Sequence, residues 1–185
     1  MQGDLILKKQ KKKIQKAIIN IMNIQRKEKL NQKLVRYIVE KAVSNLFYGP
    51  FKIDIIFCSA AYIKNLNKKY RDKNKATDIL SFEFKEYEYD ENVYFIGELF
   101  ICPSIAKKNA LDFKDFWDKE GWASKNKTKY LIKKNTEYTD FEKEIVLLLI
   151  HGILHLFGYD HTGDDDDNEE MKKLQNFLYI DAAIS

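Results

Sequence analysis

The chain has 185 residues, 45% of them hydrophobic and only two of them proline, so it can bury the core of one domain, residues 1–185. No apolar run reaches the roughly 18 residues that a membrane span needs, the N-terminus carries no signal-peptide pattern, and two cysteines imply no disulfide framework. Composition therefore argues against a disordered chain, a membrane protein and a disulfide-rich secreted domain, and it predicts a cytoplasmic protein with buried free thiols at Cys58 and Cys102.

Charge is distributed unevenly along the chain, although the net charge is only +4. Residues 1–80 contain 19 Lys and Arg against 6 Asp and Glu, whereas residues 81–185 contain 13 against 22. Such a basic half is typical of a surface that faces nucleic acid, because lysine and arginine neutralise phosphates and release their counterions. A lysine-rich face that is merely solvated fits the same pattern, so charge leaves both interpretations open.

Hydrophobic periodicity predicts the elements in chain order. Within the basic N-terminal segment of about 1–30, the lysine-rich residues 8–29 carry apolar side chains at helical spacing and predict a helix. We expect this helix to pack on the core, and a helix on a membrane surface is the alternative. The next elements are a helix over 31–47, a strand over 51–57, a helix from Ser59 as cap to about Arg71, strands over 79–84 and 94–101 joined by an acidic loop, and a helix from Pro103 to about Leu111. An insert of about 112–138 then precedes a helix over 140–157 and a last helix around 171–178.

All three histidines fall within eleven positions, at His151, His155 and His161. Three neutral imidazoles that converge can hold one transition metal and leave a coordination position open for water, which is the arrangement of a catalytic zinc site. The alternative, three unrelated polar residues on a core helix, fits poorly with this density. We therefore predict that the three histidines bind one divalent ion, with zinc as the expected metal.

The residues around the histidines predict how they converge. Thr139 and Glu142 form a capping-box pattern at the start of the helix 140–157, on which the first two histidines share a face one turn apart. Gly158 is placed to end this helix in a left-handed cap, which turns the third histidine back toward that face. Asp160 is a candidate partner for an imidazole N–H.

Gly152 decides between two kinds of metal chemistry. The histidine spacing matches the long zinc-protease pattern, which places a glutamate directly after the first histidine as the general base. This chain has glycine there and lacks that carboxylate. A glycine inside a helix costs about 1 kcal/mol relative to alanine, so we expect a close neighbour at this position, either another helix or substrate.

Four sequence blocks occur in a recognisable order: Leu66-Asn-Lys-Lys-Tyr-Arg71, Thr77-Asp-Ile-Leu-Ser-Phe82, Gly97-Glu-Leu-Phe-Ile-Cys-Pro103 and His151-Gly-Ile-Leu-His-Leu-Phe-Gly-Tyr-Asp-His161. They resemble the blocks L-N-x-x-Y-R, T-D-V-L-S-F, G-D-I-x-I-S-P and H-G-x-L-H-L-x-G-Y-D-H of the YbeY family, bacterial endoribonucleases of ribosomal RNA maturation. The resemblance covers roughly residues 50–111 and 139–180. Ala76, Glu98 and Cys102 depart from the proline, aspartate and serine that are usual in the family.

The resemblance implies an α+β fold, in which a small mixed sheet of about four strands packs with helices and three histidines hold one zinc-like ion. It implies metal-dependent cleavage of single-stranded RNA, in 16S rRNA 3′-end maturation and ribosome quality control. The partners would be rRNA precursor and the ribosomal small subunit, with no membrane. Arg71 matches the functionally important arginine of the family, and a guanidinium can hold a phosphate bidentately. Without the motif around it, Arg71 would be read as part of a surface salt bridge.

The insert and one lysine supply further candidates for RNA contacts. The stretch 121–136 contains five lysines and no acidic residue, and lysines beside aromatic side chains can follow a nucleic-acid backbone and stack bases. The candidates are Lys73, Trp122, Lys125 and Lys127. A lineage-specific loop without a role fits the insert equally well. Two other functions stay open for the chain, a zinc metallopeptidase and a non-catalytic ribosome-assembly protein with a structural metal.

Overall fold

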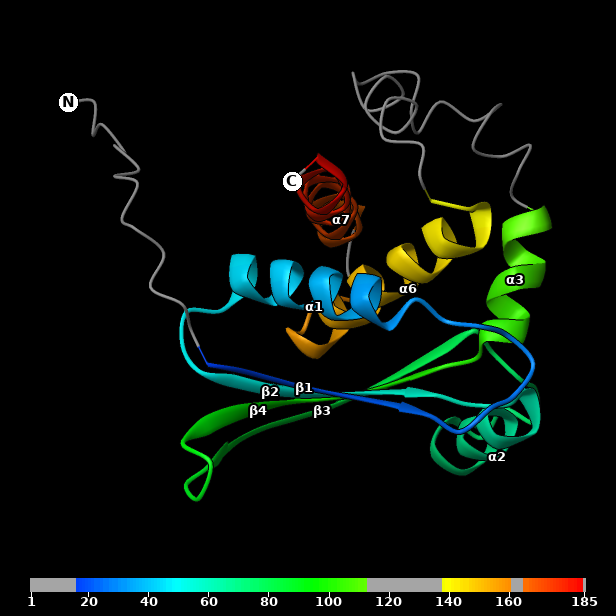
Figure 1. The fold of residues 1–185 in the computed structure, drawn as a ribbon, viewed down its shortest axis with the longest axis horizontal. Helices are drawn as coiled ribbons and strands as arrows, with labels where there is room; N and C mark the ends of the chain where they lie inside the picture. Colours follow the sequence, from blue (N-terminus) through cyan, green and yellow to red (C-terminus); the bar gives the residue numbers. More distant parts are fainter. Residues whose placement is uncertain (1–15, 113–137, 161–164, 185) are drawn as a thin grey trace.

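The computed structural model describes residues 16–112, 138–160 and 165–184. In these residues a four-stranded mixed sheet packs with five helices, which confirms the predicted α+β class (Figure 1). The elements are β1 (Ala17–Asn23), α1 (Gln32–Leu46), β2 (Phe51–Phe57), α2 (Ala60–Arg71), β3 (Ile79–Glu88), β4 (Val93–Ile101), α3 (Pro103–Asp112), α6 (Asp140–Leu156) and α7 (Asp165–Ile184). No helix in the described ranges is long and apolar enough to cross a membrane.

The strands lie in the order β1-β2-β4-β3, so β2 and β4 are central. β1 and β4 both run parallel to β2, whereas β3 forms an antiparallel hairpin with β4. Parallel neighbours need crossover connections, which α1 supplies between β1 and β2. Figure 1 shows α1 and α6 covering one face of the sheet, α7 lying over these two helices, and α2 on the opposite face.

The helix expected within residues 8–29 is wrong for the described part of that segment, because Ala17–Asn23 form the edge strand β1. The strand pairs in register with β2, from Ala17 opposite Phe51 to Asn23 opposite Phe57. Isoleucines are β-branched and pack well on a pleated surface, and pairing with a buried strand outweighs the helical spacing of the apolar residues. Residues 8–15 lie outside the described residues.

Two apolar clusters lie on the two faces of the sheet. The larger cluster fills the space between the sheet and helices α1, α6 and α7, and the inward side chains of β2 are fully buried in it: Phe51, Ile53, Ile55 and Phe57. The smaller cluster lies on the other face and includes Ile63 of α2. Cys58 and Cys102 belong to this second cluster as buried free thiols, as predicted. The larger cluster is therefore what holds α6 against the sheet.

Gly97 of β4 allows the end of α6 to approach the sheet. Its φ is +152°, and a Cβ there would lie 2.3 Å from the Phe82 backbone oxygen and 3.0 Å from Leu156 Cδ2. We expect Gly97→Ala to lower the free energy of unfolding by about 2–4 kcal/mol, because backbone strain and overpacking add. Urea denaturation measures this, and Gly49→Ala, where only the Phe47 ring lies near the added Cβ, is the control. A loss as small as that of the control would contradict the close approach.

Candidate active site

The N-terminus of α6 is fixed by the predicted capping box. The Thr139 hydroxyl accepts a hydrogen bond from the Glu142 backbone N–H at 3.2 Å, and the Glu142 carboxylate accepts one from the Thr139 N–H at 2.9 Å. Two of the backbone donors at this end are thereby satisfied. The cap sets the residue at which the helix starts. It thereby also sets the helical face on which His151 and His155 lie.

The C-terminus of α6 is closed by the predicted left-handed glycine. Gly158 has φ +89° and donates its N–H to the His155 carbonyl oxygen at 3.0 Å, while the Tyr159 N–H reaches the Leu154 carbonyl oxygen at 3.1 Å. This pair of bonds is the Schellman motif, in which glycine adopts the positive φ without steric cost. The chain therefore turns sharply one residue after Phe157.

His151 and His155 converge on the exposed end of α6. Their Nε2 atoms lie 3.1 Å apart and their rings are nearly perpendicular, at 86°. Two nitrogen ligands at 2.0–2.1 Å from a tetrahedral ion are separated by about 3.3 Å, so this geometry fits one zinc-like ion between them. Gln175 of α7 places its Oε1 atom 3.0 Å from His151 Nδ1. An imidazole that donates Nδ1–H to this oxygen presents a bare Nε2 lone pair to the ion.

The third predicted ligand, His161, lies outside the described residues. Within the described ranges no group of three or more His, Cys, Asp or Glu is placed to hold a metal ion. Asp160, the predicted partner of an imidazole, lies with its Oδ1 atom 4.0 Å from His155 Nδ1, which is ion-pair rather than hydrogen-bond distance. The structure thus places two of the three imidazoles together, and the three-histidine metal centre stays a prediction.

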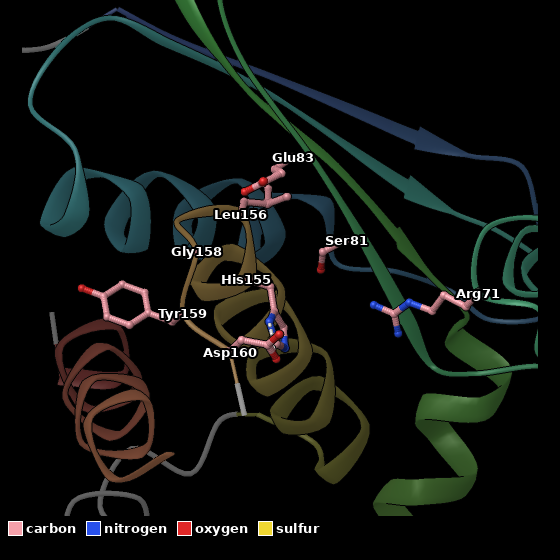
Figure 2. Close-up of a pocket in the computed structure, with 8 residues that line it drawn as sticks. All are labelled: Arg71, Ser81, Glu83, His155, Leu156, Gly158, Tyr159 and Asp160. Carbon is pink, nitrogen blue, oxygen red and sulfur yellow. Dashed lines mark ion pairs between the residues drawn. The ribbon is translucent and has the colours of Figure 1, made fainter. Parts of the chain in front are cut away.

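A cavity of about 350 Å³ opens beside the histidines (Figure 2). It is lined by residues from α2, from β3, and from the end of α6 with the turn after it: Arg71, Ser81, Glu83, His155, Leu156, Gly158, Tyr159 and Asp160. Figure 2 shows the Arg71 guanidinium pointing from α2 toward the side of the cavity where His155 lies, and the Ser81 hydroxyl pointing toward the space between these two residues. A predicted metal ligand and the predicted phosphate-binding arginine therefore share one cavity.

Arg71 is free to bind an anion in this cavity. It is the last residue of α2, and the left-handed Asp72, with φ 54°, ends the helix directly after it. Arg71 forms no ion pair with the residues that the structure describes, so the surface salt bridge that was its alternative role is not found there. Lys73 is exposed on the following turn and does not line the cavity. Trp122, Lys125 and Lys127 lie outside the described residues.

Gly152 faces the sheet, not another helix or substrate as expected from the sequence. A Cβ at this position would lie 2.6 Å from Ile79 Cδ1 and 2.8 Å from Leu99 Cδ2, both in strands beneath α6. The residue after the first histidine is therefore packed into the apolar core. A protease glutamate at this position would bury its carboxylate there without a partner, which is strongly unfavourable.

Lys85, whose ammonium group lies near the lining residues Glu83 and Gly158, has an unusual backbone conformation. Its φ is +54°, a value that costs a residue with a side chain about 1–2 kcal/mol. Its ammonium group lies 2.8 Å from the Glu83 carboxylate, but both side chains are about half exposed, at 46% and 55%. Such ion pairs contribute about 0–1 kcal/mol. The pair is therefore too weak to account for the conformation.

Glu144 has the raised pKa that is typical of a functional carboxylate, yet it does not line the cavity. Its pKa is raised to about 7, mainly by burial and also by the charge of Asp78, while a hydrogen bond with Asn109 opposes the shift. Asn109 also donates to Asp78, whose carboxylate accepts the Ile79 N–H at the start of β3. This polar group therefore supports the turn before β3 and lies outside the cavity lining.

Sequence reasoning did not single out three residues of the site. Ser81 and Glu83 lie at i+2 and i+4 from Ile79, so the alternation of β3 places them on the face that α6 covers. The alternation is visible in the sequence, but these two residues can be assigned to the site only once α6 is known to pack on β3. Nothing in the sequence around Gln175 indicates a contact with a histidine. The contact becomes visible only in the structure, where α7 packs against α6 and Gln175 is buried.

Comparisons with known proteins identify the family to which the chain belongs. The family profile described as Endoribonuclease YbeY matches residues 8–123 and 127–182. An endoribonuclease YbeY of Thermotoga maritima is 35% identical over 148 residues, which cover 80% of this chain and 75% of that relative. An endoribonuclease YbeY of Thermodesulfovibrio yellowstonii is 33% identical over 172 residues, which cover 85% of this chain and 92% of that relative. A solution structure of a Thermotoga maritima protein superposes with a TM-score of 0.52 at 31% identity and 89% coverage of both chains. The chain therefore belongs to the YbeY family.

Proposed function

We propose that the protein is a metal-dependent endoribonuclease that cuts single-stranded RNA, and that it acts in 16S rRNA 3′-end maturation and ribosome quality control. Membership of a family whose relatives are named endoribonucleases supports the reaction class. The observation that carries the proposal is the shared cavity, in which Arg71 and His155 face the same space. A phosphodiester placed there would meet an arginine on one side and the metal-binding imidazoles on the other.

The residues in and around the cavity have different roles in the proposed hydrolysis. When bound by His151, His155 and His161, a divalent ion such as zinc supplies Lewis-acid chemistry and makes water more acidic. Arg71 binds the nonbridging phosphate oxygens through its planar fork and neutralises the charge that develops on them. The Ser81 hydroxyl is placed to donate a further hydrogen bond between these groups. Gln175 holds the ring of His151 in the orientation that binding requires.

The size of the cavity supports a single-stranded substrate. A volume of about 350 Å³ is at the lower end of ordinary ligand sites, so it accommodates one nucleotide unit. A flexible single strand can bend such a unit into the cavity, whereas a duplex would first have to unstack and open. We therefore expect loops and free 3′ ends of RNA to be cut in preference to paired segments.

A cleavage assay on matched RNAs tests the proposal. The purified protein is incubated with a labelled single strand and with the same strand annealed to its complement, each with added zinc and with a chelator. We expect cleavage of the single strand alone and only with metal, and we expect it to weaken as salt rises, because phosphate contacts are screened. Cells depleted of the protein should accumulate 16S precursors with extended 3′ ends.

Two outcomes would point to the other functions. Casein hydrolysis that needs metal and disappears in His151→Ala, with RNA left intact, would make the protein a peptidase. We expect none, because Gly152 faces the sheet and brings no carboxylate to the position of the protease base. A protein that unfolds on chelation, binds the small subunit and never cuts RNA would be an assembly factor with a structural metal. Either outcome would overturn the nuclease proposal.

A further inference from the structure

Lys85 stands apart from the other residues with a left-handed backbone. In the described part of the chain, the positive-φ residues other than glycine are Asp72, Lys85 and Asn92. Asp72 caps α2 and Asn92 lies in the turn between β3 and β4, and both residue types tolerate this conformation. Lysine has no such tolerance, and its neighbour Glu83 does not compensate for the strain. The conformation therefore calls for another explanation.

The strained residue belongs to a β-bulge in β3. Glu83 pairs with Gly97 and Glu86 with Phe95, so two residues of β3, one of them Lys85, stand opposite one residue of β4. The Tyr94 hydroxyl donates to the Lys85 carbonyl oxygen at 2.8 Å and holds the bulge in place. Bulges of this kind are common beside active sites. This bulge carries a cation.

The ammonium group of Lys85 lies beside two residues that line the cavity, although Lys85 is not itself part of the lining. The Nζ atom lies 2.8 Å from Glu83 Oε2 and 3.8 Å from the position that a Cβ on Gly158 would occupy. Glu83 and Gly158 both line the cavity, and in Figure 2 they lie on the side away from Arg71. Two cations thus flank the cavity, one from the end of α2 and one from the bulge of β3.

We propose that Lys85 is a second phosphate-binding residue, which holds a phosphate of the RNA strand next to the phosphate held by Arg71. The inference rests on the proposed RNA cleavage. It adds the path of the RNA strand across the cavity, between Arg71 at one side and the Gly158 turn at the other. An ammonium has three N–H donors, so Lys85 can keep its contact with Glu83 and donate to a phosphate as well. The glutamate then acts as a tether that keeps the lysine turned toward the strand.

The alternative is that Lys85 only forms a surface ion pair. Under that alternative, removal of its charge leaves RNA binding as it is. The salt dependence of binding separates the two cases, because each phosphate contact to a single strand adds about 0.7 to the slope of log affinity against log salt. The probe is a short fluorescent 2′-O-methyl oligonucleotide, whose backbone carries the phosphates of RNA and whose integrity is checked on a gel.

Four variants make the test independent of folding. Lys85→Asn removes the charge and keeps a residue type that accepts φ +54°, and Lys85→Gly removes charge and strain together. Lys85→Arg keeps the charge. Lys33→Asn is the matched control, since Lys33 is an exposed lysine at the start of α1 and does not line the cavity. Anisotropy titrations give affinity and slope, and thermal melting gives stability.

We expect the slope to fall by about 0.7 for Lys85→Asn and Lys85→Gly and to stay unchanged for Lys85→Arg and Lys33→Asn. Lys85→Gly should also melt at a higher temperature than the parent protein, so that binding weakens while stability rises. An unchanged slope in both neutral variants, with RNA still bound and cut by the parent protein, would overturn the role of Lys85 alone. A parent protein that neither binds nor cuts single-stranded RNA would instead refute the proposed function.

Discussion

His155→Ala should lose its bound metal and at least about 100-fold of its RNA cleavage, because removal of a ligand exceeds the 10–100-fold effect that is typical of residues around ligands. The side chain is only partly buried and lies at the end of α6, so the variant is expected to fold. Metal content per chain is measured by mass spectrometry, and cleavage by gel assay. Circular dichroism verifies the fold.

Gln175→Ala is the graded control for this prediction. Gln175 contacts His151 and not the ion, so its removal should weaken metal affinity by about 10–100-fold and leave metal bound at saturating concentration. Cleavage should then be restored by added zinc in Gln175→Ala and not in His155→Ala. Stoichiometric metal in His155→Ala would remove this histidine from the predicted ligand set and with it the convergence on which the centre rests.

Arg71→Ala should keep the metal and the fold and lose about 10²–10³-fold of the cleavage rate, the range measured when one group that stabilises a developing oxyanion is removed. The side chain lies exposed at the end of α2, where nothing in the larger core depends on it. Arg71→Lys should recover little, because a single ammonium does not reproduce two parallel hydrogen bonds to a phosphate. Single-turnover kinetics at saturating RNA isolate the chemical step from binding.

Lys73→Ala is the matched control, since Lys73 follows two residues later and lies outside the cavity lining. It should reduce cleavage only through binding, with a loss that disappears at saturating RNA. A reversed result, with near-normal cleavage in Arg71→Ala and a lost chemical step in Lys73→Ala, would move the phosphate-binding role to Lys73.

Local signals predicted the elements that position the site. The capping box at Thr139 and the glycine at 158 set the two ends of the histidine helix. Ser59 likewise caps α2, because its side chain accepts a hydrogen bond from the Tyr62 N–H. Each of these signals acts within a few residues and needs no knowledge of the rest of the fold. The spacing of His151 and His155 on one helical face follows directly from that local order.

The features that could not be predicted from the sequence depend on which helices and strands pack against one another. β1 is a strand because β2 lies beside it, and Gly152 is needed because Ile79 and Leu99 lie beneath it. The contact of Gln175 with His151 likewise joins two helices whose packing no local pattern describes. The bulge at Lys85 shows the same limit, since its register is set by pairing with β4. Tertiary pairing outweighs local propensity at each of these positions.

The order of the elements along the chain also governs when the protein can fold during synthesis. The inward side chains of β2 are fully covered only when α6 packs beside α1 on the same face, and α6 begins only at Asp140. A nascent chain that ends before this helix therefore presents an apolar strand and a basic N-terminal half without a core. The segment that completes the core is thus made in the last quarter of the chain, and it carries two of the three predicted metal ligands, His151 and His155.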